Sequence, residues 1–404
     1  MKTQLEKILV VGVDTVAVAK SAIKEGYKAY VADYFGDWDL RKICSGCTAA
    51  VKQERGKSCR KMDDLDPEDF LDLTQSLHHR YQIEGTLISS GLDDCPDILS
   101  KIDGIVPILG NSPETMERVR DKPEFFGQLD RLGIPYPKSR FVKSLDQAMS
   151  KASEIGYPVV VKPTKGFAGV GIRVVRKAGE MDRAFREASS VSKNIIIQEF
   201  IEGTSVSASF VANGADFRFL TMNEQLLGVP FLFPSEPLGY CGNVVPMHFS
   251  DSIINQTKNI IEKITSHFNL KGSNGIDLVI SNCGVPYLME VNPRFQGTLE
   301  CVEKVLKINL VEAHIKASLN GTLPHLETEK PIFCTRLILH APHRASTPNV
   351  TGLPEVRDIP LPGTIIERGE PICSIVTIGD NPERSFQRGK HLAESVYRRL
   401  SSAQ

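Results

Sequence analysis

The sequence has little net charge and no long apolar run. Its 48 lysines and arginines nearly balance 49 aspartates and glutamates, so the formal net charge is -1. This balance gives no global electrostatic reason to bind nucleic acid or an anionic membrane, although a local basic cleft for phosphates stays open. A transmembrane helix needs about 18 or more apolar residues in a row, and no such run is present. We therefore expect neither nucleic acid nor a membrane as a partner.

The sequence also lacks the features of a secreted protein. Asp14 interrupts the apolar run of residues 7–13 and no small-residue cleavage site follows, so we expect no signal peptide. The nine cysteines are an odd number, spread over 404 residues, which favours reduced thiols and a cytoplasmic location. Zinc bound by Cys44 and Cys47 with more distant cysteines is an alternative, but only that one pair is closely spaced.

The first third of the chain alternates between strand and helix patterns. Residues 7–13 (KILVVGV) form a continuous apolar run, as expected of a strand buried on both faces. A helix is predicted over residues 15–25 and further strands over 28–33, 85–90 and 105–109. This progression predicts an open parallel sheet. The first turn lacks a full G-x-G-x-x-G motif, so a dinucleotide site there has weak support.

The rest of the chain is richer in strand patterns. Residues 111–150 read as connecting helices, and apolar β-type segments begin at Tyr157. Helices are predicted near 253–268, 298–319 and 384–400, and the last of them closes a proline-containing, β-rich C-terminal segment. No internal repeat or low-complexity tract is visible.

The densest motif is residues 162–171 (KPTKGFAGVG), between two strand patterns. Three glycines let backbone amides approach phosphate oxygens closely, and Lys162 and Lys165 add positive charge. The segment lacks the following helix and the GK[ST] ending of a Walker A loop. An ordinary glycine-rich hairpin is the alternative interpretation.

A pair of acids forms the second motif. Asp277 lies in GIDLVI, and Glu290 begins the sequence EVNPR after a short turn at residues 282–284. Two antiparallel strands would place these acids side by side. Two carboxylates with the Asn292 amide oxygen suit Mg²⁺ carrying ATP phosphates, and Arg294 can stabilise developing negative charge. The alternative is a structural strand pair with charged residues facing solvent.

Taken together, the motifs resemble the ATP-grasp superfamily of ligases, in its carbamoyl-phosphate-synthetase-like and biotin-carboxylase-like branch. Residues 111–137 resemble the family's linker, PVVVKPTKGFAGVGI its first ATP-binding strand and phosphate loop, and QEFIEG its adenine hinge. GIDLVI and YLMEVNPRFQGT resemble its metal-binding strands. The order of the motifs also agrees with the family.

The resemblance implies a role for each matching residue. Lys122 and Lys162 would contact ATP phosphates, the glycines would form the phosphate loop, and Glu199 and Ile201 would hold adenine. The implied nucleotide contacts are Lys122, Lys162, Lys165, Gly166, Gly169, Gly171, Glu199, Phe200, Ile201 and Glu202. The implied metal ligands are Asp277, Glu290 and Asn292, and the implied catalytic residues are Arg294 and Lys162. Many members carry a ribose-binding acid after the hinge glycine; Thr204-Ser205 stands there in this chain, and Glu202 is the substitute.

The resemblance also implies the fold and the activity. We expect an α/β and α+β protein with a Rossmann-like domain at residues 1–112, a two-part ATP-grasp domain at 113–325 and a small β-rich domain at 326–404. The ATP-binding subdomain should cover about 155–205. The cofactors would be ATP and Mg²⁺, with Mn²⁺ as an alternative.

The expected activity is an ATP-dependent carboxylate–amine ligase that forms an acyl phosphate, releases ADP and phosphate, and acts on small molecules, with a homodimer left open. A bicarbonate-using carboxylase is one alternative, although the chain lacks a biotinyl A-M-K-M motif. A nucleotide-binding protein without turnover is the other.

Overall fold

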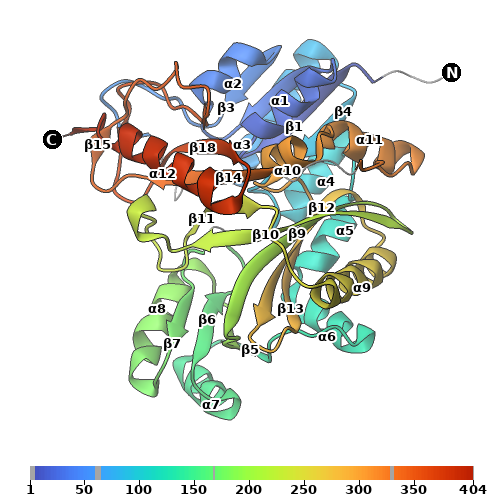
Figure 1. The fold of residues 1–404 in the computed structure, drawn as a ribbon, viewed down its shortest axis with the longest axis vertical. Coiled ribbons are helices and arrows are strands. Elements are labelled where there is room, and N and C mark those ends of the chain that lie inside the picture. Colours follow the sequence, from blue (N-terminus) through green and yellow to red (C-terminus); the bar gives the residue numbers. More distant parts are fainter. Residues whose placement is uncertain (1–4, 60–64, 167–168, 328–331, 404) are drawn as a thin grey trace.

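The N-terminal segment forms a parallel sheet flanked by helices in the computed structural model, which describes residues 5–59, 65–166, 169–327 and 332–403 (Figure 1). Its strands pair in the order β3-β2-β1-β4. The elements are β1 (Lys7–Gly12), α1 (Val16–Lys24), β2 (Lys28–Asp33), α2 (Trp38–Ile43), β3 (Gly46–Ala49), α3 (Pro67–Tyr81), β4 (Gly85–Ile88) and α4 (Pro96–Ile105). The continuous apolar sequence of β1 follows from its central place, because both faces of the strand are buried.

The strand predicted over residues 105–109 is wrong. Ile105 is the last residue of α4, which continues this far because its apolar residues repeat at helical spacing and are buried. The side chain of Asp103 then accepts a hydrogen bond from the Ile108 amide and turns the chain. Only a single bridge, between Ile108 and Thr86 of β4, extends the sheet here.

Two short helices follow, α5 (Pro113–Arg120) and α6 (Lys122–Leu132). Asp121 lies between them and caps α6, since its side chain accepts a hydrogen bond from the Glu124 amide. The cap leaves Arg120 as the last residue of one helix and Lys122 as the first residue of the next. Two cations are thereby fixed within one tight bend of the chain.

A small four-stranded sheet lies at one end of the molecule (Figure 1). Its elements are β5 (Ser139–Val142), α7 (Leu145–Ile155), β6 (Val159–Pro163), β7 (Arg173–Val175), α8 (Met181–Val191) and β8 (Ile195–Glu199), in the strand order β5-β8-β6-β7. β6 and β7 are antiparallel, so the glycine motif connects two strands as predicted. Residues 167–168 of that motif lie outside the described residues.

An eight-stranded sheet forms the centre of the molecule, in the order β13-β12-β9-β10-β11-β14-β18-β16. Its strands are β9 (Gly203–Asn213), β10 (Phe217–Leu227), β11 (Tyr240–Val245), β12 (Lys271–Ser281), β13 (Pro286–Asn292), β14 (Phe333–His340), β16 (Val356–Arg357) and β18 (Pro371–Gly379). Strands of the β-rich C-terminal segment therefore continue the sheet that carries the predicted metal-binding strands. The division at residues 112 and 325 stays a prediction.

Helices and short strands complete the central part of the fold. These are α9 (Asp251–Phe268), α10 (Leu299–Leu306), α11 (Leu310–Asn320), α12 (Pro382–Tyr397), and a three-stranded sheet of β15 (Ala345–Ser346), β17 (Ile365–Ile366) and β19 (Ser401–Ser402). Residues 298–319, predicted as one helical stretch, form two helices. Lys307 has a left-handed backbone (φ 54°) that ends α10, and the side chain of Asn309 caps α11.

The mixed α/β architecture confirms the predicted fold class. A parallel N-terminal sheet is combined with two sheets whose pairings are antiparallel. None of the helices in the described part of the chain has both the length and the apolar composition needed to cross a membrane.

Candidate active site

The predicted acid pair lies in the hairpin of β12 and β13. The turn between them is short because Gly284 adopts a positive φ of 81°, which a residue with a side chain rarely adopts. The resulting register places Asp277 opposite Glu290, with an irregularity directly after Asp277. The two carboxylates are therefore neighbours on adjacent strands, as the sequence predicts.

Two cations from the α5–α6 bend contact Glu290. Lys122 Nζ lies 3.1 Å and Arg120 Nη1 lies 3.4 Å from Glu290 Oε2. Both cationic side chains are less than a tenth exposed. Burial alone would raise the pKa of Glu290, but Lys122, Arg120 and Lys162 together hold it well below the usual range of a glutamate. Glu290 is thus ionised at neutral pH.

Asp277 lies in a different electrostatic environment. Its Oδ1 accepts a hydrogen bond from Gln225 Nε2 at 2.9 Å, and its Oδ2 accepts one from Asn292 Nδ2 at 3.1 Å. Burial and the neighbouring charge of Glu290 raise the pKa of Asp277 to about 7. A divalent cation between the two carboxylates would remove this repulsion.

The donor set therefore fits Mg²⁺. Two carboxylates and an amide are hard oxygen ligands of the kind that this ion takes. The Asn292 amide donates to Asp277 through Nδ2, and its Oδ1 accepts a hydrogen bond from Arg294 Nη2 at 3.4 Å.

Arg294 connects this hairpin to the N-terminal sheet. Its Nε lies 2.5 Å from Asp93 Oδ1, and its Nη1 donates to the carbonyl of Phe295 at 2.8 Å. Burial opposes the ionised form of Asp93, but Arg294 and Arg120 lower the pKa of this carboxyl. Asp93 follows β4, at the carboxyl end of a parallel strand, which is where open α/β sheets form ligand crevices. Arg294 thus links the end of β13 to the loop after β4.

Lys162 lies on β6, with Lys122 and Glu290 as its charged neighbours. Burial and the positive charge of Lys122 lower the pKa of Lys162 to about 7. Lys165, three residues later, is exposed. The two lysines at the start of the glycine motif therefore lie in different environments. Lys162 has charged neighbours in the site, whereas Lys165 faces solvent.

The three glycines of the motif adopt positive φ angles. The values are 139° at Gly166, 84° at Gly169 and 73° at Gly171. A Cβ atom at Gly169 would lie 2.9 Å from the carbonyl oxygen of Leu238, so a side chain is excluded there by contact as well as by conformation. The Gly166 amide donates a hydrogen bond to Asp94 Oδ2 at 3.1 Å.

The predicted adenine hinge lies at the end of β8. The Glu199 amide donates to the carbonyl of Lys138, and Glu199 Oε2 accepts from the Lys138 amide at 3.1 Å. Phe200 and Ile201 are half-buried, while Glu202 is exposed. These contacts fix Glu199 against Lys138. They do not connect it to the charged cluster formed by Glu290, Lys122, Arg120 and Asp277.

Three charged residues of the cluster were missed by the sequence analysis: Arg120, Asp93 and Asp94. Arg120 directly precedes the Asp-Lys pair that the family resemblance singles out, and the two aspartates lie in the loop after β4. Their position after a predicted parallel strand was the signal that could have identified them.

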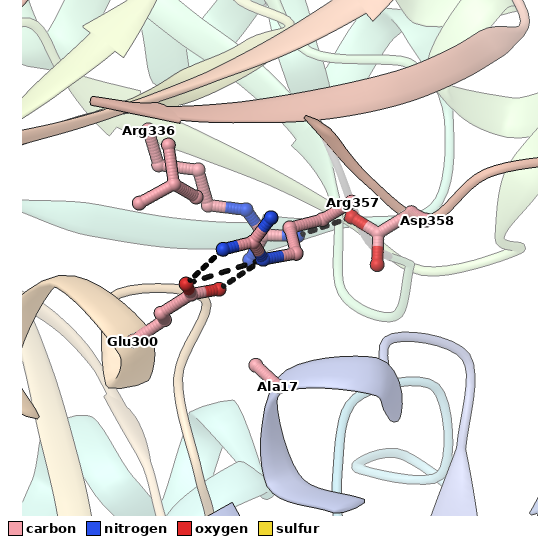
Figure 2. Close-up of a pocket in the computed structure, with 6 residues that line it drawn as sticks. Ala17, Glu300, Arg336, Arg357 and Asp358 are labelled. Atoms are coloured by element: carbon pink, nitrogen blue, oxygen red, sulfur yellow. Dashed lines mark hydrogen bonds and ion pairs between the residues drawn. The ribbon is translucent and has the colours of Figure 1, made fainter. Parts of the chain in front are cut away.

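A second charged cluster lies around Arg336 of β14. Its Nη1 donates to Asp14 Oδ2 at 2.8 Å and its Nη2 to Asp358 Oδ2 at 3.1 Å. Nearby, Arg357 Nη2 and Glu300 Oε1 are 2.7 Å apart. Figure 2 shows Arg336 with Asp358 and Arg357 with Glu300 around a narrow pocket. The cluster ties the loop after β1 to the C-terminal strands.

The zinc alternative receives no support from the geometry. In the part of the chain that the structure describes, no group of three or more histidine, cysteine, aspartate or glutamate side chains is arranged to hold a metal ion. Burial raises the pKa values of Cys44 and Cys47 to about 12, so both are neutral thiols.

Residues 119–298 match the family model of the ATP-grasp domain, and this range contains Lys122, the glycine motif, the hinge and the β12–β13 hairpin. The chain contains an ATP-grasp domain. The resemblance to the ATP-grasp family that the order of the motifs indicates is confirmed over this range.

Similar proteins extend this result beyond the matched domain. An uncharacterized protein of Methanocaldococcus jannaschii is 26% identical over 374 residues, which cover 92% of this chain and 88% of that one. The arginine-specific large chain of carbamoyl phosphate synthase from Bacillus subtilis is 28% identical over 209 residues, 51% of this chain and 20% of that one. The ATP-grasp protein thus spans about a fifth of the synthase chain.

A solved structure shows the same fold over nearly the whole chain. The biotin carboxylase domain of 2-oxoglutarate carboxylase from Hydrogenobacter thermophilus, solved with MgADP, ADP and bicarbonate, has a TM-score of 0.75 at 15% identity. The alignment covers 99% of this chain and 91% of that one. At this identity the likeness establishes the fold of the ATP-grasp protein, not its substrates.

Proposed function

We propose that this ATP-grasp protein is an ATP-dependent carboxylate–amine ligase that acts through an acyl phosphate. The observation that carries the proposal is the convergence of Asp277, Glu290 and Arg294, from the β12–β13 hairpin and its end, with Lys122 at the start of α6. Two anions, ATP and a substrate carboxylate, must meet in this reaction, so positive charge has to be positioned around them. The substrates would be a small carboxylate, amino-acid-like or a cofactor precursor, and a small amine.

The chain's own residues would divide the work between nucleotide and acid. Lys122 and Lys162 would hold ATP phosphates, and the proximity of Lys162 to phosphate would restore its full positive charge. Glu199 and Ile201 would hold adenine, with Phe200 beside them and Glu202 at the ribose. Mg²⁺ bound to Asp277, Glu290 and Asn292 would supply charge neutralisation at the β- and γ-phosphates.

The reaction itself needs no nucleophile from the protein. A substrate carboxylate oxygen attacks the γ-phosphorus and the bond to the β-phosphate oxygen breaks, which gives ADP and an acyl phosphate. Arg294 would stabilise the negative charge on the phosphoryl group. The amine nitrogen then attacks the acyl carbon, loses a proton and expels phosphate.

Two alternatives share much of this site. A carboxylase would use bicarbonate as the acid, and a binding protein would hold nucleotide without turnover. The combination of an acid pair with Lys122, Lys162 and Arg294 favours catalysis, because nucleotide binding alone does not require all of these groups together.

The test is an assay of ADP release over a panel of amino acids, dipeptides, cofactor precursors and bicarbonate, with mass spectrometry of the products. We expect one carboxylate to stimulate ADP and phosphate formation. Hydroxylamine should trap its acyl phosphate as a hydroxamate. Stimulation by bicarbonate alone would favour the carboxylase. Stoichiometric AMP would contradict the proposal, because it would mean attack at the α-phosphate.

A further inference from the structure

Arg120 is shared between two carboxylates that belong to different domains. Its Nε lies 2.8 Å from Asp94 Oδ1, and its Nη1 lies 3.4 Å from Glu290 Oε2. Only 9% of its side chain is exposed. Negative charge on Glu290, Asp93 and Asp94 outweighs burial and raises the pKa of Arg120, so the guanidinium stays charged.

The second oxygen of Asp94 is occupied by the glycine motif. Asp94 Oδ2 accepts the hydrogen bond from the Gly166 amide at 3.1 Å. One carboxylate thus connects the phosphate-loop backbone to Arg120, and Arg120 connects it to Glu290. Gly166 and Glu290 are linked through two side chains that the reaction proposed above does not use.

Arg120 does not make its strongest type of contact with Asp94. A guanidinium and a carboxylate pair most strongly through two parallel hydrogen bonds. Here Arg120 Nε contacts Asp94 Oδ1, the Gly166 amide donates to Asp94 Oδ2, and Arg120 Nη1 is directed toward Glu290. A backbone amide that binds a carboxylate is also suited to a phosphate oxygen, which carries more charge.

We propose that Asp94 and Arg120 form a relay that couples phosphate binding at Gly166 to metal binding at Glu290. The relay rests on the proposed function, since it requires ATP at the glycine motif. A nucleotide phosphate replaces Asp94 at the Gly166 amide, which frees Asp94 Oδ2. Arg120 then closes a two-point contact with Asp94 and leaves Lys122, 3.1 Å away, as the remaining cation at Glu290 Oε2, so a divalent cation displaces one contact there instead of two.

In this relay Arg120 and Asp94 are positioning residues, and their effect is on the linkage between ligands. Nucleotide and metal bind with positive coupling, because each removes a competitor of the other. Arg120 contacts two carboxylates, Asp94 and Glu290, and loss of Asp94 leaves it with Glu290. Arg120 then competes with the metal even when nucleotide is bound.

The experiment measures binding of β,γ-imido-ATP by calorimetry at a series of free Mg²⁺ concentrations. Asp94→Ala should raise the Mg²⁺ concentration for half-maximal nucleotide binding roughly tenfold, the size of one charge-assisted hydrogen bond. Asp94→Asn should give the same shift, because it keeps an acceptor for Gly166 but loses the charge that attracts Arg120. This conservative variant guards against a loss of folding in the alanine variant.

The double variant Asp94→Ala with Arg120→Gln supplies the decisive comparison. It should return the Mg²⁺ requirement to the wild-type value or below, since Arg120 no longer competes with the metal at Glu290. A merely structural role for Arg120 would predict a further loss instead. Asp97→Ala, an exposed aspartate on the following helix, is the matched control and should bind as wild type.

The outcomes separate the relay from the proposed function. A wild-type protein that binds no nucleotide at any Mg²⁺ concentration contradicts the proposed function and the relay with it. A wild-type protein that binds nucleotide, with Asp94 variants of unchanged Mg²⁺ requirement, overturns the relay alone. A double variant that stays shifted like Asp94→Ala also overturns it.

Discussion

Replacement of Glu290 by glutamine tests the charged centre of the site. Glu290 faces Asp277 across the hairpin and balances Lys122 and Arg120 at 3.1 and 3.4 Å. The substitution keeps the size of the side chain and removes one negative charge. It therefore removes a proposed metal ligand and the counter-charge of two buried cations in a single step.

The expected loss of activity is larger than the expected loss of stability. Without this ligand the transition state should lose about 4 kcal/mol of stabilisation, on the order of 10³-fold in rate. Removal of one partner from a fully buried ion pair costs about 3–5 kcal/mol. Because 32% of the Glu290 side chain is exposed, water screens the cations that remain, and we expect about 1–2 kcal/mol.

The assay is ADP release under saturating substrate, beside thermal unfolding of the same preparations. Glu290→Gln should lower turnover strongly and the unfolding midpoint by a few degrees. The control is Glu262→Gln on the exposed face of α9, which should leave both unchanged. Near-normal turnover in Glu290→Gln would refute the metal assignment. An unfolded Glu290→Gln protein would show that the counter-charge contributes much more than about 1–2 kcal/mol to stability.

Three further predictions concern single side chains. Lys162→Ala should raise the KM for ATP and lower kcat more than Lys165→Ala, because Lys165 is exposed; steady-state kinetics with the reverse order would show that the phosphate contact is wrongly assigned. The pKa of Lys162 is lowered to about 7, so this amine is mostly neutral at pH 8. Binding of ADP at pH 8, with a chelator present to remove metal, should therefore protonate Lys162 and take about one proton from solution. Calorimetry in buffers of different ionisation enthalpy measures this uptake, which Lys162→Ala should abolish. Burial lowers the pKa of His314 from 6.5 to about 4. Between these pH values the unfolded chain binds a proton at His314 that the folded chain does not. The free energy of unfolding should therefore fall by up to about 3 kcal/mol as the pH drops from 6.5 toward 4. Urea unfolding against pH measures this loss, and an equal loss in His314→Leu would contradict the assignment.

The parts of the site that are local in sequence were predictable. Asp277 and Glu290 lie on strands joined by a short turn, so the alternation of residues and the glycine turn set their register. The glycine motif between two strand patterns was recognised for the same reason. The order of these motifs along the chain identified the ATP-grasp family, although no single motif was specific enough.

Local patterns were less reliable where backbone geometry interrupts them. The apolar residues at 105–109 have a strand-like composition, yet the helix before them continues to Ile105 because its buried face does. The stretch 298–319 has helical composition throughout, yet Lys307 turns left-handed and divides it. Composition does not reveal such interruptions, since neighbouring packing decides where each helix ends.

The sequence by itself determined the family, through the order of its motifs. It also determined the acid pair and the glycine motif, because each of these depends on residues close together in the chain. Tertiary structure alone decided which charges surround them. Asp94 and Gly166 are 72 residues apart, and Asp93 and Arg294 are 201 apart. Contacts over such separations exist only when the parallel sheet packs against the ATP-grasp domain, and pairing rules within one strand or helix carry no information about that packing.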